Sequence, residues 1–225
     1  VGVANHLTAR KAIQPGDVLL MTEGAGGGTI ATAAIYSGFP DVVDETINLH
    51  FLKACEALLA SDVLNGIHAM TDVTNGGLRG DAYEMAETAG CRIVVEEDEL
   101  RTLVQPKVLA MLDALEIDYL GVSLDALLVV APPEVAPDIR RVVASAGVAM
   151  KEVGYVEKGA PESVLSVGGE IRDFSPRFRE SAYTPVKKVV DEDKRDFAEM
   201  KAGVERAAEA ALAKKLRILS RLRSS

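Results

Sequence analysis

The sequence predicts an α/β protein, an α+β sandwich in which helices cover a mixed sheet and a long helix ends the chain. Short apolar runs rich in β-branched residues alternate with longer stretches of helical periodicity, which is typical of a sheet covered by helices. Hydrophobic residues make up 48% of the 225 residues, enough to bury a core. Residues 191–223 consist mainly of strong helix formers without proline, which predicts the long helix.

In the first half of the chain, Pro15-Gly16 forms a turn ahead of a buried strand, and glycines open the following helix. The expected strands cover 17–22, 67–70 and 92–96. The expected helices cover 29–36, 45–61, 78–89 and 107–115. In the helix 45–61, we expect five apolar residues on one face: Ile47, Phe51, Ala54, Leu58 and Leu59.

The second half continues the alternation. Residues 125–131 predict a buried strand, and Pro132-Pro133 start a helix that ends at Gly147, because proline suits a first helical turn. Residues 150–157 alternate like a strand, and 163–169 form a hairpin arm. Residues 174–190 are irregular. The final helix carries an apolar stripe of Phe197, Met200, Val204, Ala208, Ala211, Ile218 and Leu222.

The bulk properties exclude several classes of protein. A net charge of −9 argues against a general nucleic-acid binder, because phosphate contacts need clustered Lys and Arg. No apolar run reaches the roughly 18 residues that span a bilayer, so no membrane contact is expected. Cys55 and Cys91 lack disulfide or metal-ligand spacing, which favours a reducing cytoplasm. The three histidines also lack such spacing, so ordinary structural roles are expected of them.

Glycines 24–28 stand between an expected strand and an expected helix. Backbone N–H groups there can approach a phosphate, and the helix N-terminus adds partial positive charge. No Gly-Lys-Ser/Thr follows, so the cluster is not a Walker A loop. Taken alone, a tight turn with close strand–helix packing explains these glycines better than a phosphate site does.

A second motif runs from His68 to Leu78, where a strand ends in Asp72 and paired glycines lead into a helix. The carboxylate can hold Mg²⁺ or a ligand hydroxyl, while Gly76 and Gly77 expose backbone donors to an anion. Alternatively, the motif is only a capping device, with Asp72, Thr74 or Asn75 as the N-cap. The physical chemistry of the motif leaves the two readings about even.

The sequence Met70-Thr-Asp-Val-Thr-Asn-Gly-Gly-Leu78, followed by Glu84-Met-Ala-Glu87, resembles the C-terminal domain of the aminoimidazole ribonucleotide (AIR) synthetase superfamily. Further segments agree in order: Pro15-Gly-Asp-Val-Leu19, the run 127–134, Val153-Gly-Tyr-Val156 and Val167-Gly-Gly169. The resemblance covers residues 1–174. The superfamily includes formylglycinamide ribonucleotide amidotransferase, selenophosphate synthetase, thiamine-monophosphate kinase and the hydrogenase maturation factor that makes the cyanide ligand.

The resemblance implies an ATP- and Mg²⁺-dependent enzyme that activates or phosphorylates a small molecule. It also implies a cytoplasmic location and a homodimeric assembly. Residues 1–16 would end an N-terminal domain and link it to a C-terminal domain at 17–185, with a helical extension at 186–225. Most of the nucleotide and metal site would lie on that N-terminal domain, and the present piece alone would be inactive.

The resemblance also nominates site residues. Asp72 and Thr74 would be catalytic, and Asp72 would also anchor the metal. Substrate or phosphate would be bound by Gly26, Gly27, Gly28, Thr29, Thr71, Asn75, Gly76 and Gly77. Several members carry histidine immediately before the motif aspartate. This chain carries Thr71 there, and selenophosphate synthetases also tend to carry threonine. The substrate therefore stays open, and the alternatives are a selenophosphate synthetase-like kinase and a non-catalytic, ligand-binding regulatory member.

Overall fold

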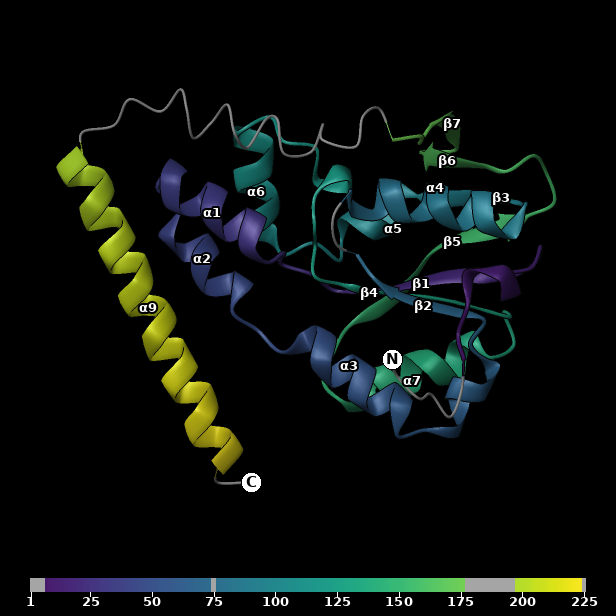
Figure 1. Cartoon of the computed structure of the whole chain (residues 1–225), viewed down its shortest axis with the longest axis horizontal. Coiled ribbons are helices and arrows are strands. Elements are labelled where there is room, and N and C mark those ends of the chain that lie inside the picture. Colours follow the sequence, from purple (N-terminus) through teal and green to yellow (C-terminus); the bar gives the residue numbers. More distant parts are fainter. Residues whose placement is uncertain (1–6, 74–75, 177–196, 224–225) are drawn as a thin grey trace.

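A computed structural model describes residues 7–73, 76–176 and 197–223. It is built around one mixed seven-stranded sheet (Figure 1). The strands are β1 (Val18–Thr22), β2 (Ala69–Asp72), β3 (Arg92–Glu96), β4 (Leu127–Ala131), β5 (Met150–Glu157), β6 (Glu162–Val167) and β7 (Glu170–Asp173). The helices are α1 (Gly28–Ser37), α2 (Pro40–Thr46), α3 (His50–Leu59), α4 (Gly77–Ala89), α5 (Glu97–Arg101), α6 (Pro106–Ala114), α7 (Ala136–Ser145) and α9 (Phe197–Arg223), with short 3-10 turns at Arg10–Ala12, Asp62–Gly66 and Tyr119–Gly121.

The strand order is β2-β4-β1-β5-β3-β6-β7, and only the pairing of β3 with β6 is parallel. Both β1 and β2 are antiparallel to β4, so they run in the same direction. Their C-terminal ends therefore lie on either side of the start of β4, at one end of the strands of the sheet. We call this place the strand-end edge and define it by residues 22–28, 71–77 and 119–126.

Alternation along the strands divides the interior into two cores. In β1, Leu19 and Met21 face the larger core, while Val18 and Leu20 face the smaller one, as the two-residue period of a strand requires. Helices α4 and α5 cover the larger core, and α3 and α7 cover the opposite face of the sheet (Figure 1). With both faces covered, β1 and β4 are buried along their whole length, which accounts for their uninterrupted apolar sequence.

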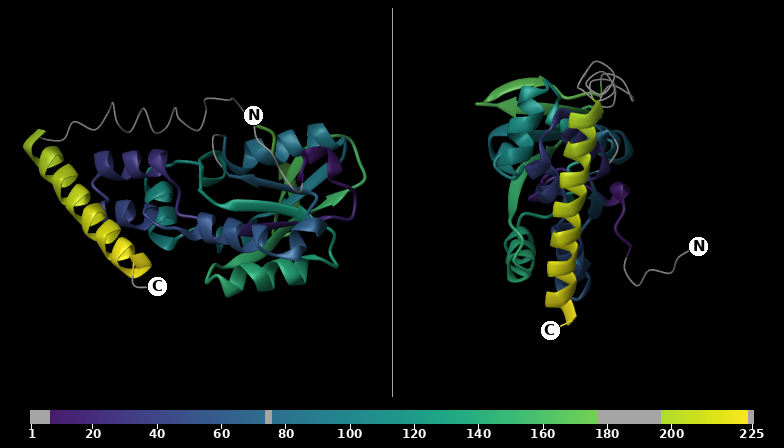
Figure 2. Two further views of the ribbon diagram at one scale, coloured as in Figure 1. Left: turned by 60° about the horizontal axis from the view of Figure 1, so that its bottom comes forward. Right: turned by 90° about the vertical axis from the view of Figure 1, so that its left-hand side faces the viewer.

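Helices α1, α2, α6 and α9 form a helical end beside the sheet. Both further views show α9 lying along the outer side of α1 and α2 (Figure 2). Ala207 is buried in this contact, and Ala211 and Ile218 are half-buried. In the part of the chain that the structure describes, every helix is too short or too polar to span a bilayer.

Most predicted elements are confirmed within a few residues, but the predicted helix 45–61 is wrong as a single element. The structure has α2 and α3, separated by residues 47–49. The Asn48 side chain accepts a hydrogen bond from the backbone N–H of His50 and donates one to the Glu45 carbonyl, which replaces helical bonding at this point. As a result, Ile47 leaves the predicted apolar face. Leu59, also predicted on that face, is 62% exposed at the end of α3.

Two further boundaries differ. Helix α7 starts at Ala136, because residues after Pro132-Pro133 form a turn first. On α9, the packed face centres on Ala207, whereas the predicted stripe members Val204 and Ala208 are exposed. At the predicted Pro15-Gly16 turn, the Asp17 carboxylate accepts a hydrogen bond from the Gln14 N–H at 2.8 Å. The same carboxylate contacts His68 Nδ1 at 2.7 Å and thereby ties the turn to the residue before β2.

Candidate functional site

The first residues of β4 hold the ends of β1 and β2 together at the strand-end edge. Asp72 at the end of β2 pairs with Leu127 in the sheet register. On the other side, the fully buried hydroxyl of Thr22 accepts the Leu127 N–H at 2.9 Å. The side-chain oxygen thus replaces a backbone acceptor where the β1 ladder stops. This bond fixes where the glycine loop after β1 departs from the sheet.

The loop of residues 24–28 packs backbone to backbone with its neighbours. A Cβ on Gly24 would lie 2.4 Å from the Leu124 carbonyl oxygen, so only glycine fits there. Gly26, with φ of 74°, donates its N–H to the same oxygen at 2.8 Å. Gly27 and Gly28 face open space instead. The crowding of Gly24 and Gly26 agrees with the tight-turn interpretation. Gly27 and Gly28 have open space beside them, and their binding of a phosphate stays a prediction.

Helix α1 begins at Gly28 with Gly27 as its N-cap, and the structure records no side-chain cap there. The N–H groups of its first turn therefore point outward beside half-exposed Thr29. Helix α4 begins in the same way after Gly76, again without a recorded side-chain cap in the described part of the chain. Each helix N-terminus is an anion-attracting point at the strand-end edge.

The motif after β2 makes the second half of the site. Val73 exchanges backbone hydrogen bonds with the start of β4, donating to the Ala126 carbonyl at 2.8 Å and accepting the Asp125 N–H at 3.3 Å. Asp72 is exposed, and Thr71 is half-exposed. Because Gly76 is the N-cap of α4, the Asp72 carboxylate does not serve as that cap. Thr74 and Asn75 lie outside the described residues.

Residues 119–126 lie between the two glycine turns. Gly77, at φ of 63°, approaches this segment so closely that a Cβ would lie 2.4 Å from the Leu120 carbonyl oxygen. Gly24 makes the matching approach at Leu124. The segment thereby fixes the relative position of the two helix starts through close backbone contacts, and the Ser123 hydroxyl donates a further hydrogen bond to the Val73 carbonyl at 3.3 Å.

The negative charge of Asp72 acts on two neighbouring carboxyl groups, those of Asp125 and Asp81. Asp125 has a φ of 52°, which is unusual for a non-glycine residue and often marks a functional site. Burial and the negative charge of Asp72 raise its pKa. Burial raises the pKa of Asp81 to about 7; nearby Arg10 opposes the shift, and Glu84 and Asp72 add to it. Arg10 reaches Asp81 at 3.2 Å.

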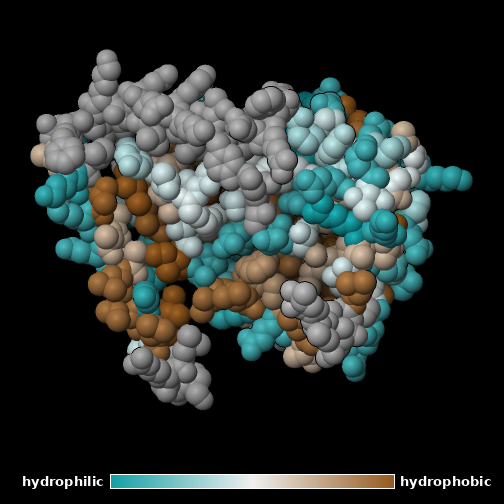
Figure 3. Space-filling view, in the orientation of Figure 1, coloured by the Kyte–Doolittle hydropathy of each residue, from teal (hydrophilic) through white to brown (hydrophobic). Residues whose placement is uncertain are grey.

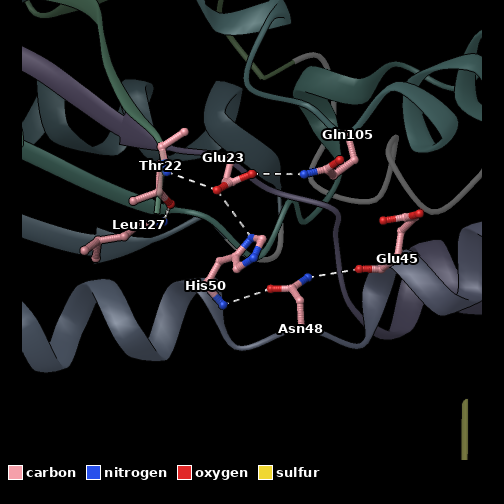
Figure 4. A network of polar contacts seen from close by, with 8 residues as sticks. Thr22, Glu23, Glu45, Asn48, His50, Gln105 and Leu127 are labelled. Atoms are coloured by element: carbon pink, nitrogen blue, oxygen red, sulfur yellow. Dashed lines mark hydrogen bonds and ion pairs between the residues drawn. The ribbon is translucent and has the colours of Figure 1, made fainter. Parts of the chain in front are cut away.

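Glu23, the first residue after β1, centres a further polar network (Figure 4). Its carboxylate accepts the Gln105 side-chain amide and the Ala149 N–H, both at 3.0 Å, and lies 3.6 Å from His50 Nδ1. Asn48 joins this network through the His50 backbone, as described for the break between α2 and α3. The sequence assigned His50 an ordinary structural role. In the structure its imidazole points toward the Glu23 carboxylate near the glycine loop, which is compatible with that role.

We tested whether these residues fit a metal ion. Among the described residues, no group of three or more His, Cys, Asp or Glu side chains lies close enough to hold one. By itself, Asp72 offers one carboxylate ligand to a metal ion.

The structure brings together most of the residues that the sequence nominated: Gly26, Gly27, Gly28 and Thr29 on one side, and Thr71, Asp72, Gly76 and Gly77 on the other. Sequence reasoning missed Asp125, Asp81 and Glu23 as site residues. An acid opening the otherwise apolar run 125–131 was the available signal for Asp125. No comparable pattern pointed to Asp81, which becomes a neighbour of Asp72 only through folding.

Comparison with known proteins shows which family the chain belongs to. Residues 14–166 match the family described as AIR synthase related protein, C-terminal domain. The chain is 53% identical over 209 residues to the uncharacterized protein MJ1416 of Methanocaldococcus jannaschii, covering 92% of this chain and 45% of that protein. It is 35% identical over 127 residues to carbamoyl dehydratase HypE of Rhodobacter capsulatus, covering 54% of this chain and 35% of that protein.

A third relative is selenide, water dikinase of Caldanaerobacter subterraneus subsp. tengcongensis, 35% identical over 106 residues, which cover 44% of this chain and 29% of that protein. The chain thus spans less than half the length of these relatives. The fold is similar to that of hydrogenase maturation protein HypE, with a TM-score of 0.61 at 21% identity over 77% of this chain and 56% of that one. A structure of HypE in complex with ATP gives a TM-score of 0.58 at 20% identity, over 76% of this chain and 53% of that one. With more than half of its residues matched, this chain belongs to the AIR synthase related protein family through that family's C-terminal domain.

Proposed function

We propose that this chain is the C-terminal part of an ATP-dependent enzyme that activates or phosphorylates a small molecule, with the strand-end edge as one wall of the site. One observation carries the proposal: two helix N-termini, both opened by glycine, flank Asp72 and Asp125 at a single edge. Such N–H donors stabilise charge on a transferring phosphoryl group or on an oxyanion.

The comparisons support the cofactor. HypE has been solved in complex with ATP, and selenide, water dikinase is a kinase by name. Because the chain spans less than half of its curated relatives' length, we assign the remainder of the nucleotide and Mg²⁺ site to residues outside it. The whole enzyme would work in the cytoplasm, and this piece alone would be inactive.

Each residue has a proposed role. Gly27 and Gly28 would donate backbone N–H groups to phosphate or to the activated oxygen, with Thr29 beside them, and Gly26 would shape the loop. Gly76 and Gly77 would do the same from α4, and Thr71, Thr74 and Asn75 would contact the substrate. Asp72 would hold a substrate hydroxyl or supply one ligand to Mg²⁺ carried by the nucleotide. Asp125, with its raised pKa, suits proton transfer.

The test is calorimetric titration of ATP with Mg²⁺ into this chain and into the full-length natural protein. We expect tight, Mg²⁺-dependent binding by the longer protein and little by the 225-residue chain. Replacing Asp72 with Ala in the full-length protein should then lower turnover or ligand affinity by about tenfold or more, roughly 1.4 kcal/mol.

The matched control is Asp62→Ala, which removes an exposed carboxylate that precedes β2, at the opposite end of that strand from Asp72. Unchanged turnover and affinity in Asp72→Ala would contradict the role of that residue. No binding of ATP by either protein would refute the ATP-dependent enzyme and leave the fold as a ligand-binding module.

A further inference from the structure

Arg79, the third residue of α4, is largely buried on a polar part of the molecule. In the space-filling view, hydrophilic residues predominate around α4, whereas hydrophobic residues follow α9 (Figure 3). Only 14% of the Arg79 side chain is exposed. A cation in the first turn of a helix also opposes the positive end of the helix dipole, so this position does not stabilise α4 by itself. Contacts with other elements therefore account for where the side chain lies.

Two contacts fix the Arg79 guanidinium. Its Nη2 donates a hydrogen bond to Asp118 Oδ2 at 2.9 Å. Its central carbon lies 4.7 Å from the centre of the Phe174 ring, whose side chain is fully buried. A planar guanidinium can pair with a carboxylate and stack over a ring at the same time, which fixes both its position and its direction. Arg79 thus connects the first turn of α4 to the residue before Tyr119 and to the residue after β7.

Asp118 connects this contact to the strand-end edge. Its Oδ1 accepts the Leu120 N–H at 3.0 Å, while its Oδ2 binds Arg79. The carbonyl of the same Leu120 is the group that Gly77 approaches so closely that no Cβ would fit. Gly77 and Arg79 are the first and third residues of α4. The first turn of this helix therefore contacts residues 118–120 at two points, once through backbone packing and once through a side chain.

We propose that Arg79 is a positioning residue of the strand-end edge. Through Asp118 it keeps Leu120 against Gly77, and it thereby keeps the N–H groups of the first turn of α4 directed at the phosphate or oxyanion. In this role Arg79 acts through Asp118 and need not touch the ligand. The inference rests on the proposed function, which gives Gly76 and Gly77 a donor role and leaves Arg79 without one.

Hydrogen exchange of the 225-residue chain tests the Arg79–Asp118 contact without any ligand. The Leu120 and Gly121 amides both donate to Asp118, to its carboxylate and its carbonyl respectively. In Arg79→Gln, these two amides should exchange about tenfold faster than in the parent, because the Asp118 turn is released locally. Exchange at the parent's rate would overturn the proposal.

Arg92→Gln is the matched control for hydrogen exchange. The Arg92 guanidinium also pairs with carboxylates, those of Glu157 at 2.8 Å and Glu162 at 3.1 Å, but it lies at the start of β3, away from the strand-end edge. The Leu120 and Gly121 amides should exchange at the parent's rate in this variant. Equal acceleration in Arg92→Gln and Arg79→Gln would mean that the loss is global, and would overturn a specific role of Arg79.

Calorimetric titration of ATP with Mg²⁺ into the full-length natural protein tests the role of Arg79 in binding. Arg79→Gln and Asp118→Ala should each lower the affinity about tenfold. The double variant should bind no more weakly than Asp118→Ala alone, because the two residues act as one unit. Arg79→Lys should bind as weakly as Arg79→Gln, since an ammonium group lacks the planar fork that pairs and stacks together. Circular dichroism checks that each variant is folded.

The outcomes separate this inference from the proposed function. Parent-like affinity in Arg79→Gln would overturn the role of Arg79 and leave the proposed function intact. Full affinity in Arg79→Lys would mean that only the positive charge matters. A double variant about 100-fold weaker than the parent would mean that Arg79 and Asp118 act separately. Either of these two results would overturn positioning through Asp118. No ATP binding by the parent would refute the proposed function, and with it the role of Arg79 in binding.

Discussion

The strand-end edge and the helical end are built from opposite kinds of contact. At the edge, glycine backbones meet carbonyl oxygens so closely that no side chain fits, as Gly77 does at Leu120. At the helical end, α9 lies on α1 and α2 through small residues and one lysine, and its leucines stay exposed. The strand-end edge depends on backbone geometry, so substitutions of its glycines should be poorly tolerated. The helical end depends on side chains with room to move, so substitutions there should cost less.

The largest expected effect is at the edge. Gly77→Ala should lower the free energy of unfolding by about 3 kcal/mol, because it combines a positive φ with a clash against the Leu120 carbonyl. Gly90→Ala is the matched control: its φ of 67° is nearly the same, but open space surrounds it, so about 1 kcal/mol is expected. Urea unfolding measures both. Equal losses would mean that crowding at the edge contributes nothing.

A smaller effect follows from Asp81. Its folded pKa of about 7 lies above the ordinary 3.8, so the folded protein keeps a proton that the unfolded chain releases. The stabilisation from that proton is complete below about pH 4 and is lost as pH rises to about 7. The free energy of unfolding of the parent, minus that of Asp81→Asn, should fall by about 2 kcal/mol from about pH 5 to about pH 7. Urea unfolding across this range measures the difference.

The control for this titration is Asp62→Asn, which changes a carboxylate that is already exposed. The pH-dependent change for Asp81→Asn should exceed any change in this control. A constant difference for Asp81→Asn would mean that Asp81 is ionised throughout the range and that its burial on α4 does not favour the protonated form.

The smallest effect belongs to the helical end. Lys214→Met removes the contact with Asp44 but keeps the apolar stem, and should cost about 0.5–1 kcal/mol. Lys215→Met, one residue on and lining the hollow between α9 and residues 47–49, should change stability by less. Hydrogen exchange of the α9 amides is the sensitive measurement, because it reports local release of the helix. Equally faster exchange in both variants would show that the Lys214 contact with Asp44 does not specifically hold α9 on its domain.

Periodicity and turn chemistry predicted most of the fold, because β1, α4 and β4 obey local rules of burial and capping. The break at Asn48 escaped prediction, since the apolar spacing of Ile47, Phe51 and Ala54 continues through it as if one helix were present. Only the side-chain hydrogen bonds of Asn48 end that regularity.

The candidate site was predictable in part. The motifs at Gly24–Gly28 and Asp72–Gly77 are visible as sequence, and the resemblance linked them. Their meeting at one edge depends on β4 pairing with both β1 and β2. Asp125 enters the site through that pairing and through its own positive φ. Neither follows from local sequence, since both arise from contacts between residues about 50 to 100 positions apart.

The position of β1 inside the sheet, with a neighbour on each side, has a consequence for biosynthesis. Its two neighbours, β4 and β5, follow about 100 residues or more later in the chain. At a synthesis rate of about 5–20 residues per second, the apolar strand Val18–Thr22 waits roughly 5–20 s on the ribosome before β4 exists. Contacts of such long sequence separation also close slowly. During translation, this strand is therefore the segment of the sheet with the longest need for protection from aggregation.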